Sequence, residues 1–214
     1  MVELLSHTPD PDGVCAIAAN ACVSQGISVM DDGGEVGRSL KHALASGHES
    51  VLEHAVFTFA VQGISRACSH QLVRHRMASF SQQSQRYVDM GDFGYTVPES
   101  IRNIPGALED YQGLMRGIKD YYDEFVSYYG IPKEDARYIL PEATQSNIVI
   151  TMNARELRHF LSLRLCNRAQ WEIRELAERM LELCREQAPV IFADAGPLCT
   201  RDGCRETRPC GRKA

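Results

Sequence analysis

No aspartate or glutamate occurs between His54 and Val88, although the chain of 214 residues carries 28 of these acids and a net charge of −5. The centre of this gap, from Arg74 to Tyr87, holds three arginines, one histidine, three serines and three glutamines. Guanidinium groups without acidic neighbours in the sequence are free to bind an outside anion, and their planar fork fits phosphate. The serines and glutamines add neutral donors and acceptors that orient a polar ligand. The segment therefore predicts a binding site for a small anion, with a solvated basic patch as the alternative.

A second cationic feature lies on the longest predicted helix, which Asn153 caps and which runs toward Gln187. Arg164 and Arg168 fall in the middle of its apolar stripe, which is formed by Leu157, Phe160, Leu161 and Trp171. A buried guanidinium is costly unless an anion or a full set of acceptors meets it. No acid lies one turn away on the stripe. The partner is therefore either a distant acid of the fold or a ligand.

Two sequence blocks resemble the flavin-dependent thymidylate synthases. The first is Arg74-His75-Arg76, followed after seven residues by Ser84 and then by Arg86-Tyr87. The second comprises Asn153-Ala154-Arg155, Arg164 and the run Ala169-Gln170-Trp171-Glu172-Ile173. The family makes dTMP from dUMP, with methylenetetrahydrofolate as carbon donor, FAD as hydride carrier and NADPH as reductant. The resemblance also implies a homotetramer with active sites between subunits.

The resemblance assigns roles to individual residues. Arg164 falls at the arginine that activates the uracil, and is the implied catalytic residue. The implied flavin contacts are Ser50, Arg74, His75, Arg76, Gln82, Asn153, Arg155 and His159. The implied dUMP contacts are Gln71, Arg74, Gln82, Ser84, Gln85, Arg86, Arg137 and Arg164. The chain departs from the family at Ser81-Gln82, where many members carry Asn-Glu, and at Arg168 and His159, where some relatives have His and Asn.

The residue types suit this chemistry. Arginine cannot act as a general base near neutral pH, but it can stabilise an ionised uracil N3 through paired hydrogen bonds. We expect Arg164 to polarise the uracil while Arg74, Arg86 and Arg137 hold the phosphate and ribose. A nucleophilic serine needs an adjacent base, so positioning of dUMP is the favoured role of Ser84. A cysteine-dependent route would instead require Cys68 or Cys166, the two cysteines near the motifs.

The pattern of elements predicts an α+β fold with a mostly antiparallel sheet packed by long helices, as in the thymidylate synthase-complementing fold. Strands are expected at residues 2–5, 55–61 and 146–151, and a polar loop at 79–85. Helices are expected after Pro9, from Gly33 to Gly47, from Ser65 to Arg76, over 106–129, after Pro132 and over 153–187. The helix from Ser65 would place Gln71 and His75 on one face. The aromatic stripe of 106–129 indicates core or subunit interface. Residues 1–192 are expected to form one catalytic domain, and 193–214 a tail.

Composition narrows the function classes. The apolar runs are too short for a membrane span, and the net charge argues against bulk nucleic-acid binding, so we expect a cytoplasmic protein without nucleic-acid or membrane partners. The glycines near Gly33 lack the order of a dinucleotide fingerprint. The competing hypothesis is a nucleotide- or RNA-binding module without catalysis.

Metal sites are not expected in this sequence. His48 and His54 lie six residues apart, off one helical face. Of the eight cysteines, Cys15, Cys22, Cys68 and Cys166 are expected to be buried and reduced, whereas Cys184, Cys199, Cys204 and Cys210 crowd the C-terminal end. A zinc site, disulfides and a solvated tail with free thiols are the three hypotheses for that end, and the solvated tail is favoured.

Overall fold

The computed structural model describes residues 1–27, 35–200 and 203–211. Its strands are β1 (Val2–His7), β2 (Val56–Ser65), β3 (Ala78–Gln82) and β4 (Gln145–Asn153). Its α-helices are α1 (Pro11–Ala21), α2 (Glu35–Ala45), α3 (Arg66–Leu72), α4 (Glu99–Arg102), α5 (Pro105–Asp123), α6 (Lys133–Ala136), α7 (Ala154–Arg164) and α8 (Trp171–Gln187). Shorter helical pieces are the 3₁₀ helices η1 (Glu49–His54), η3 (Arg137–Ile139) and η4 (Leu198–Thr200), and the π-helix η2 (Glu124–Tyr128).

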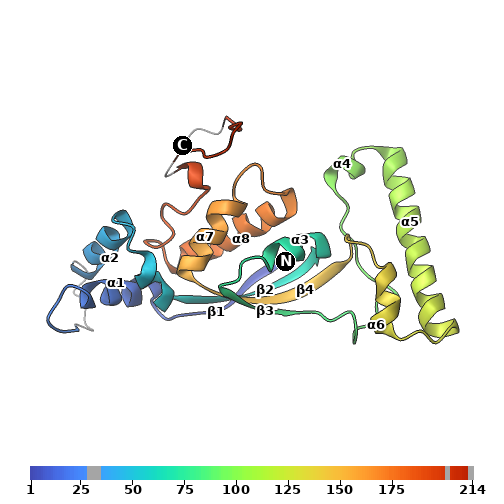
Figure 1. The fold of residues 1–214 in the computed structure, drawn as a ribbon, viewed down its shortest axis with the longest axis horizontal. Helices are drawn as coiled ribbons and strands as arrows, with labels where there is room; N and C mark the ends of the chain where they lie inside the picture. The colour runs from blue at the N-terminus through green and yellow to red at the C-terminus, as the bar shows by residue number, and fades with distance from the viewer. Residues whose placement is uncertain (28–34, 201–202, 212–214) are drawn as a thin grey trace. The chain divides into compact units, whose positions relative to one another are not determined.

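The four strands form one antiparallel sheet in the order β1-β2-β4-β3 (Figure 1). Thr8 N donates to Val56 O where β1 meets β2. The hydroxyl oxygens of Thr58 and Thr151 lie 3.0 Å apart across β2 and β4. Alternate residues of β2 and β4 are buried, as expected for strands with one covered face. This arrangement confirms the predicted mixture of helices with an antiparallel sheet.

The chain divides into two compact units. The first unit comprises Met1, Val61–Leu72 and Ser81–Ile148, and the second comprises Val2–Ala60, Val73–Phe80 and Val149–Ala214. Strands β2, β3 and β4 each contribute residues to both units.

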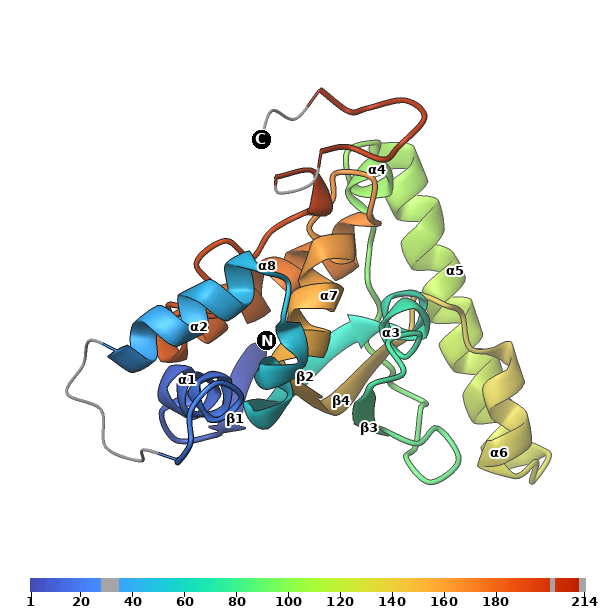
Figure 2. The same ribbon diagram turned by 60° about the vertical axis from the view of Figure 1, so that its left-hand side comes forward.

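The second unit packs helices against one another and against the sheet. Helix α1 packs against α2 and η1, and α7 packs against η1 and α8 (Figure 2). The core includes Phe57 of β2, whose ring meets Phe192 edge to face at 5.6 Å. Asp12, in the first turn of α1, accepts hydrogen bonds from Val190 N and Ile191 N at 2.8 and 3.0 Å. These contacts join the two ends of the chain in one core.

The first unit is built around the long helix α5 (Figure 1). Its core cluster consists of Met90, Phe93, Met115, Tyr122 and Ala136. Met90 N donates to the hydroxyl of Tyr122 at 3.3 Å, which satisfies the buried phenol. The aromatic stripe predicted for this helix divides between two environments, because Tyr111, Ile118 and Phe125 pack against the cluster while Leu114, Tyr121 and Tyr129 are exposed.

The predicted long helix from Asn153 to Gln187 is wrong, because the structure breaks it into α7 and α8 between Leu165 and Gln170. Asn153 does cap α7, and its side chain accepts from Glu156 N. A second cap starts α8, where the Gln170 side chain accepts from the backbone N–H groups of the second and third helical residues. The change of direction removes Arg168 and Trp171 from the stripe of α7.

Two smaller predictions also fail. Helix α3 ends at Leu72, so His75 lies beyond it and the four-residue spacing from Gln71 carries no helical meaning. Residues 78–82 form strand β3 where a polar loop was expected. The predicted cap at Ser65 is confirmed, since its hydroxyl accepts from Cys68 N at 3.0 Å. Gly33 and Gly34, the expected start of α2, lie outside the described residues.

Within the described ranges, no helix combines the length and the apolar character that a membrane crossing requires.

Candidate functional site

Arg164 is the last residue of α7, is half-buried, and forms a hydrogen-bonded chain with buried His75 and Glu156. Arg164 Nε donates to His75 Nε2 at 3.1 Å, and His75 Nδ1 lies 3.0 Å from Glu156 Oε1. The side chains of His75 and Glu156 are only 3% and 10% exposed. Phe160 and His159 meet the His75 ring edge to face, at 5.0 and 5.8 Å between centroids.

The partners of His75 determine its tautomer. Arginine can only donate, so Nε2 must present its lone pair to Arg164 and the proton must sit on Nδ1, which donates to Glu156. Burial lowers the pKa of His75, the hydrogen bond and the charge of Glu156 oppose this, and the charges of Arg164 and His159 lower the pKa further. A neutral imidazole therefore joins a carboxylate to a guanidinium, and it fixes Arg164 at its Nε atom.

The same histidine belongs to a group with metal-ligand spacing. Ligand atoms of His75, Glu156 and His159 all lie within 4.8 Å of one another. Both ring nitrogens of His75 already have partners, however, and the guanidinium of Arg164 lies against one of them. A cation here would meet a like charge, so the hydrogen-bonded chain accounts for this geometry better than a metal site.

The remaining predicted flavin contacts of the second unit are polar and mostly exposed. Ser50 lies in the first turn of η1, and Arg74 and Arg76 flank buried His75 on the segment after α3. Among the described residues, neither Arg74 nor Arg76 forms an ion pair, as their acid-free surroundings predict. Arg155 Nη1 pairs with Glu53 Oε1 at 2.5 Å, and both side chains are about half exposed.

Three predicted nucleotide contacts of the first unit lie at the end of β3 or directly after it. Gln82 Nε2 donates to the hydroxyls of Ser69 and Ser146, at 3.0 and 3.2 Å. The hydroxyl of Ser84 accepts from Arg86 N, so it caps the turn that follows β3. Gln85 is buried, and its Nε2 has no hydrogen-bond partner among the described residues. A buried amide donor without a partner is costly, and it marks a position where a ligand oxygen would fit.

Two predicted phosphate contacts also lie in the first unit. Arg86 pairs with Glu134 at 2.7 Å, so its acid-free sequence surroundings did not keep it clear of carboxylates in the fold. Arg137 Nε donates to Glu134 O. Sequence reasoning missed Arg66, whose pKa is lowered by burial, raised by Glu142 and lowered by the charge of Arg137. The charges of Glu142 and Arg137 therefore both act on Arg66, with Glu142 as the larger of the two effects.

Two charged residues of α7 escaped the sequence analysis. Glu156 shares with His75 the role of orienting Arg164. The one sequence signal for this role is that Glu156 lies one turn before Phe160, on the same face of α7. Arg158 is 3% exposed, and it donates to Ile191 O and to Asp194 Oδ1, the latter at 2.7 Å. Arg158 is thus the buried guanidinium of α7, and its charge is balanced by Asp194, an acid distant in the sequence.

Comparisons with known proteins identify relatives of this chain. The model of the family described as "Thymidylate synthase complementing protein" matches residues 3–190. The flavin-dependent thymidylate synthase of Geobacter sulfurreducens is 48% identical over all of this chain and 94% of its own length. The chain belongs to this family. Flavin-dependent thymidylate synthases of Nitratidesulfovibrio vulgaris and Clostridium tetani are 46% and 41% identical, over 99% and 100% of this chain and 94% of their own lengths.

Proposed function

We propose that this chain catalyses the reductive methylation of dUMP to dTMP, with methylenetetrahydrofolate as carbon donor, FAD as cofactor and NADPH as reductant. Family membership over nearly the whole chain supports this reaction. The observation that carries the site assignment is the hydrogen-bonded chain of Glu156, His75 and Arg164, because it holds the Nε side of the guanidinium in a defined position.

The residues of the second unit fit a flavin. Arg74 and Arg76 offer two exposed guanidinium groups without ion pairs among the described residues, which suits a pyrophosphate. Ser50, Asn153, Arg155 and His159 add donors and acceptors of the second unit, and Gln82 adds one of the first. When bound, FAD supplies the hydride, which no side chain can provide.

The residues of the first unit fit a nucleotide monophosphate. Gln85 offers a buried donor, and Gln71, Gln82 and Ser84 offer further polar groups. Arg86, Arg137 and neighbouring Arg66 supply the charge for the phosphate. The pair between Arg86 and Glu134 is about half exposed, so a phosphate can replace the carboxylate at little cost.

Arg164 polarises the uracil in this proposal. Its guanidinium stabilises negative charge that develops at N3 and O4 of the base, and His75 holds the guanidinium in place from the Nε side. Ser84 positions dUMP, because its hydroxyl already caps a turn and accepts from Arg86 N. Cys68 is fully buried in α3, which speaks against a thiolate attack on the base by this residue.

Assembly completes the proposal. Leu114 and Tyr121 of α5, Tyr128 at the end of η2 and Tyr129 directly after it are exposed, and exposed apolar side chains of this kind support a homotetramer, in which active sites lie between subunits. The two units act together as one catalytic domain of residues 1–192, a proposal supported by the family match across both. The expected cytoplasmic location stays a prediction.

Substitution of Arg164 by Ala tests the assignment. Turnover should fall about 10²-fold or more, because a charge-stabilising donor is lost, while flavin stays bound. The measurement combines an assay of dTMP formation with the visible absorption spectrum, recorded before and after the anaerobic addition of NADPH and dUMP. Arg179→Ala is the matched control, because the ion pair that Arg179 forms in the described structure is with exposed Glu182 in α8. Near-normal turnover in the Arg164 variant would remove this residue from the mechanism, and a wild-type chain that takes up no FAD would favour the nucleotide- or RNA-binding module.

A further inference from the structure

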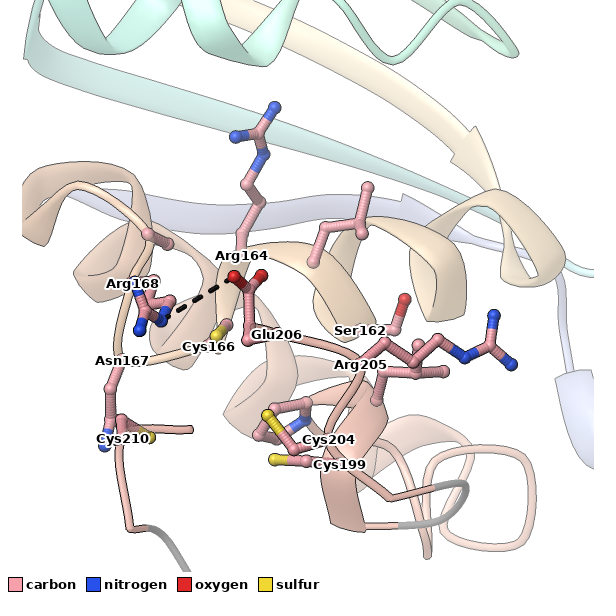
Figure 3. Close-up of a pocket in the computed structure, with 14 residues that line it drawn as sticks. Ser162, Arg164, Cys166, Asn167, Arg168, Cys199, Cys204, Arg205, Glu206 and Cys210 are labelled. Carbon is pink, nitrogen blue, oxygen red and sulfur yellow. Dashed lines mark hydrogen bonds and ion pairs between the residues drawn. The ribbon is translucent and has the colours of Figure 1, made fainter. Parts of the chain in front are cut away.

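Four cysteines from three parts of the second unit line one cavity of about 320 Å³ (Figure 3). Cys166 follows α7, Cys199 lies in η4, and Cys204 and Cys210 belong to the C-terminal segment. This set differs from the one that the sequence grouped, because Cys184 is fully buried in α8, where burial raises the pKa of its thiol. Cys166 takes its place in the cluster.

The C-terminal segment is docked on the connection between α7 and α8. Asn167 Nδ2 donates to Cys210 Sγ at 3.6 Å, and Arg168 donates to Arg208 O. Arg168 also lies 3.7 Å from a carboxylate oxygen of Glu206 (Figure 3). Residues 203–211 are exposed, as expected for a solvated tail, and these contacts hold them beside the connection between α7 and α8.

The charges around the cavity favour thiolates. Arg164, Arg168 and Arg205 line it together with one acid, Glu206. Neighbouring guanidinium groups stabilise the thiolate form of cysteine, which is the form that binds metals. Four thiolates around a divalent ion carry a net charge of about −2, which the arginines would balance. Disulfides are neutral, so the cationic lining of this cavity would not favour them in the way that it favours thiolates.

We propose that Cys166, Cys199, Cys204 and Cys210 form a tetrathiolate site for a zinc ion. Soft thiolate ligands select zinc over harder ions, and the four residues between Cys199 and Cys204 lie within the spacing of paired zinc ligands. The ion fastens the C-terminal segment to the residues that directly follow Arg164. None of the four proposed ligands is a proposed flavin or nucleotide contact, although Arg164 lines the same cavity, and the existence of the zinc site does not depend on the proposed reaction.

Binding requires the segment to close around the ion. Sulfur atoms of a tetrahedral zinc site lie about 3.8 Å apart, because each Zn–S bond is about 2.3 Å. In the described part of the chain, no three of these sulfur atoms lie within 4.8 Å of one another. Residues 203–211 have no helix or strand, so they can move inward without breaking a regular element. Metal binding and ordering of this segment are therefore coupled.

Metal analysis of the full chain tests the proposal. Protein made in zinc-supplemented medium, kept reduced and desalted, is measured for zinc and iron by mass spectrometry, and is then reconstituted with cobalt. The variants are Cys204→Ser and Cys210→Ser, which change exposed residues and leave the core intact. Cys22→Ser is the matched control, because Cys22 is an exposed cysteine at the end of α1, remote in sequence from the cluster.

We expect about one zinc per chain in the wild type and in the Cys22 variant, with most of it lost in the other two. Cobalt should give the intense visible bands of a tetrahedral thiolate site in the wild type. These bands should be absent from Cys204→Ser and from Cys210→Ser. Zinc near zero, iron with acid-labile sulfide, intramolecular disulfides in the freshly isolated protein, or full zinc retention in both variants would each overturn the proposal. Turnover and flavin content are measured separately, so a failed synthase assay leaves the zinc result readable.

Discussion

Substitution of Glu156 by Gln tests whether the buried carboxylate positions Arg164 through His75. His75 Nδ1 and Glu156 Oε1 lie 3.0 Å apart, and the two side chains are 3% and 10% exposed. Water therefore cannot enter to replace the charged acceptor that the substitution removes. A charge-assisted hydrogen bond contributes about 1.4 kcal/mol more than a neutral one, which corresponds to about tenfold in rate. We therefore expect kcat to fall about tenfold, with an unchanged flavin content.

The pH profile separates positioning from simple destabilisation. Protonated His75 donates from both nitrogens, so its Nε2–H would face Arg164 Nε–H and the chain would break. Activity that depends on this chain should therefore fall toward acid pH as His75 protonates. Glu156 raises the pKa of His75 against the stronger effect of burial, so removing its charge lowers that pKa further. The acid limb of the kcat profile should thus move to lower pH in the variant.

The assay measures kcat and the KM for dUMP between pH 5 and pH 9, together with thermal unfolding. Glu182→Gln is the control, since the ion pair of this exposed acid among the described residues is with Arg179, within α8. Wild-type kcat in the Glu156 variant, or an acid limb that stays in place or moves up, would refute the reasoning. The same pKa affects stability. Because folding lowers the pKa of His75 from its ordinary value of 6.5, this histidine contributes to the free energy of unfolding at pH values above 6.5, and the contribution is lost as the pH falls below 6.5.

Three further substitutions have expected outcomes. Cys68→Ala should retain dTMP formation, since the thiol is fully buried in α3, and lost activity in a folded, flavin-loaded variant would support the cysteine-dependent route. Arg158→Met should lower the free energy of unfolding in urea by about 2 kcal/mol, because it removes charged hydrogen bonds to Ile191 O and Asp194; a loss no larger than that of Arg179→Met would contradict this. Gln170→Ala should cost about 1 kcal/mol by removing the cap of α8, and unchanged urea unfolding would show that the cap is dispensable.

Local patterns predicted the elements well. Strand β2 follows a β-branched and aromatic run, β4 follows a β-branched run, and Asn153 begins a helix as its cap position indicates. The break between α7 and α8 was missed because apolar periodicity continues across it. The Gln170 side chain accepts two backbone N–H groups, a capping role for which Ser, Thr, Asp and Asn are the usual residues. Helical periodicity alone does not report a change of direction.

Tertiary contacts were harder to predict than elements. The acid-free segment kept Arg74 and Arg76 clear of ion pairs in the described structure, but Glu134 reaches Arg86 from 48 positions away. Glu156 carries no motif that sets it apart from a surface acid of a helix. Its role follows from burial beside His75, a contact between residues 81 positions apart in the sequence.

The two hydrogen bonds of Asp12 to Val190 and Ile191 have a consequence for biosynthesis. The second unit draws its residues from both ends of the chain, whereas almost all of the first unit lies between Val61 and Ile148. On the ribosome, the first unit can emerge complete while the second still lacks α7, α8 and the partners of Asp12. The apolar faces of α1 and α2 therefore stay exposed until the last part of the chain has been translated. A chain truncated before Val190 would leave these faces accessible to chaperones and proteases.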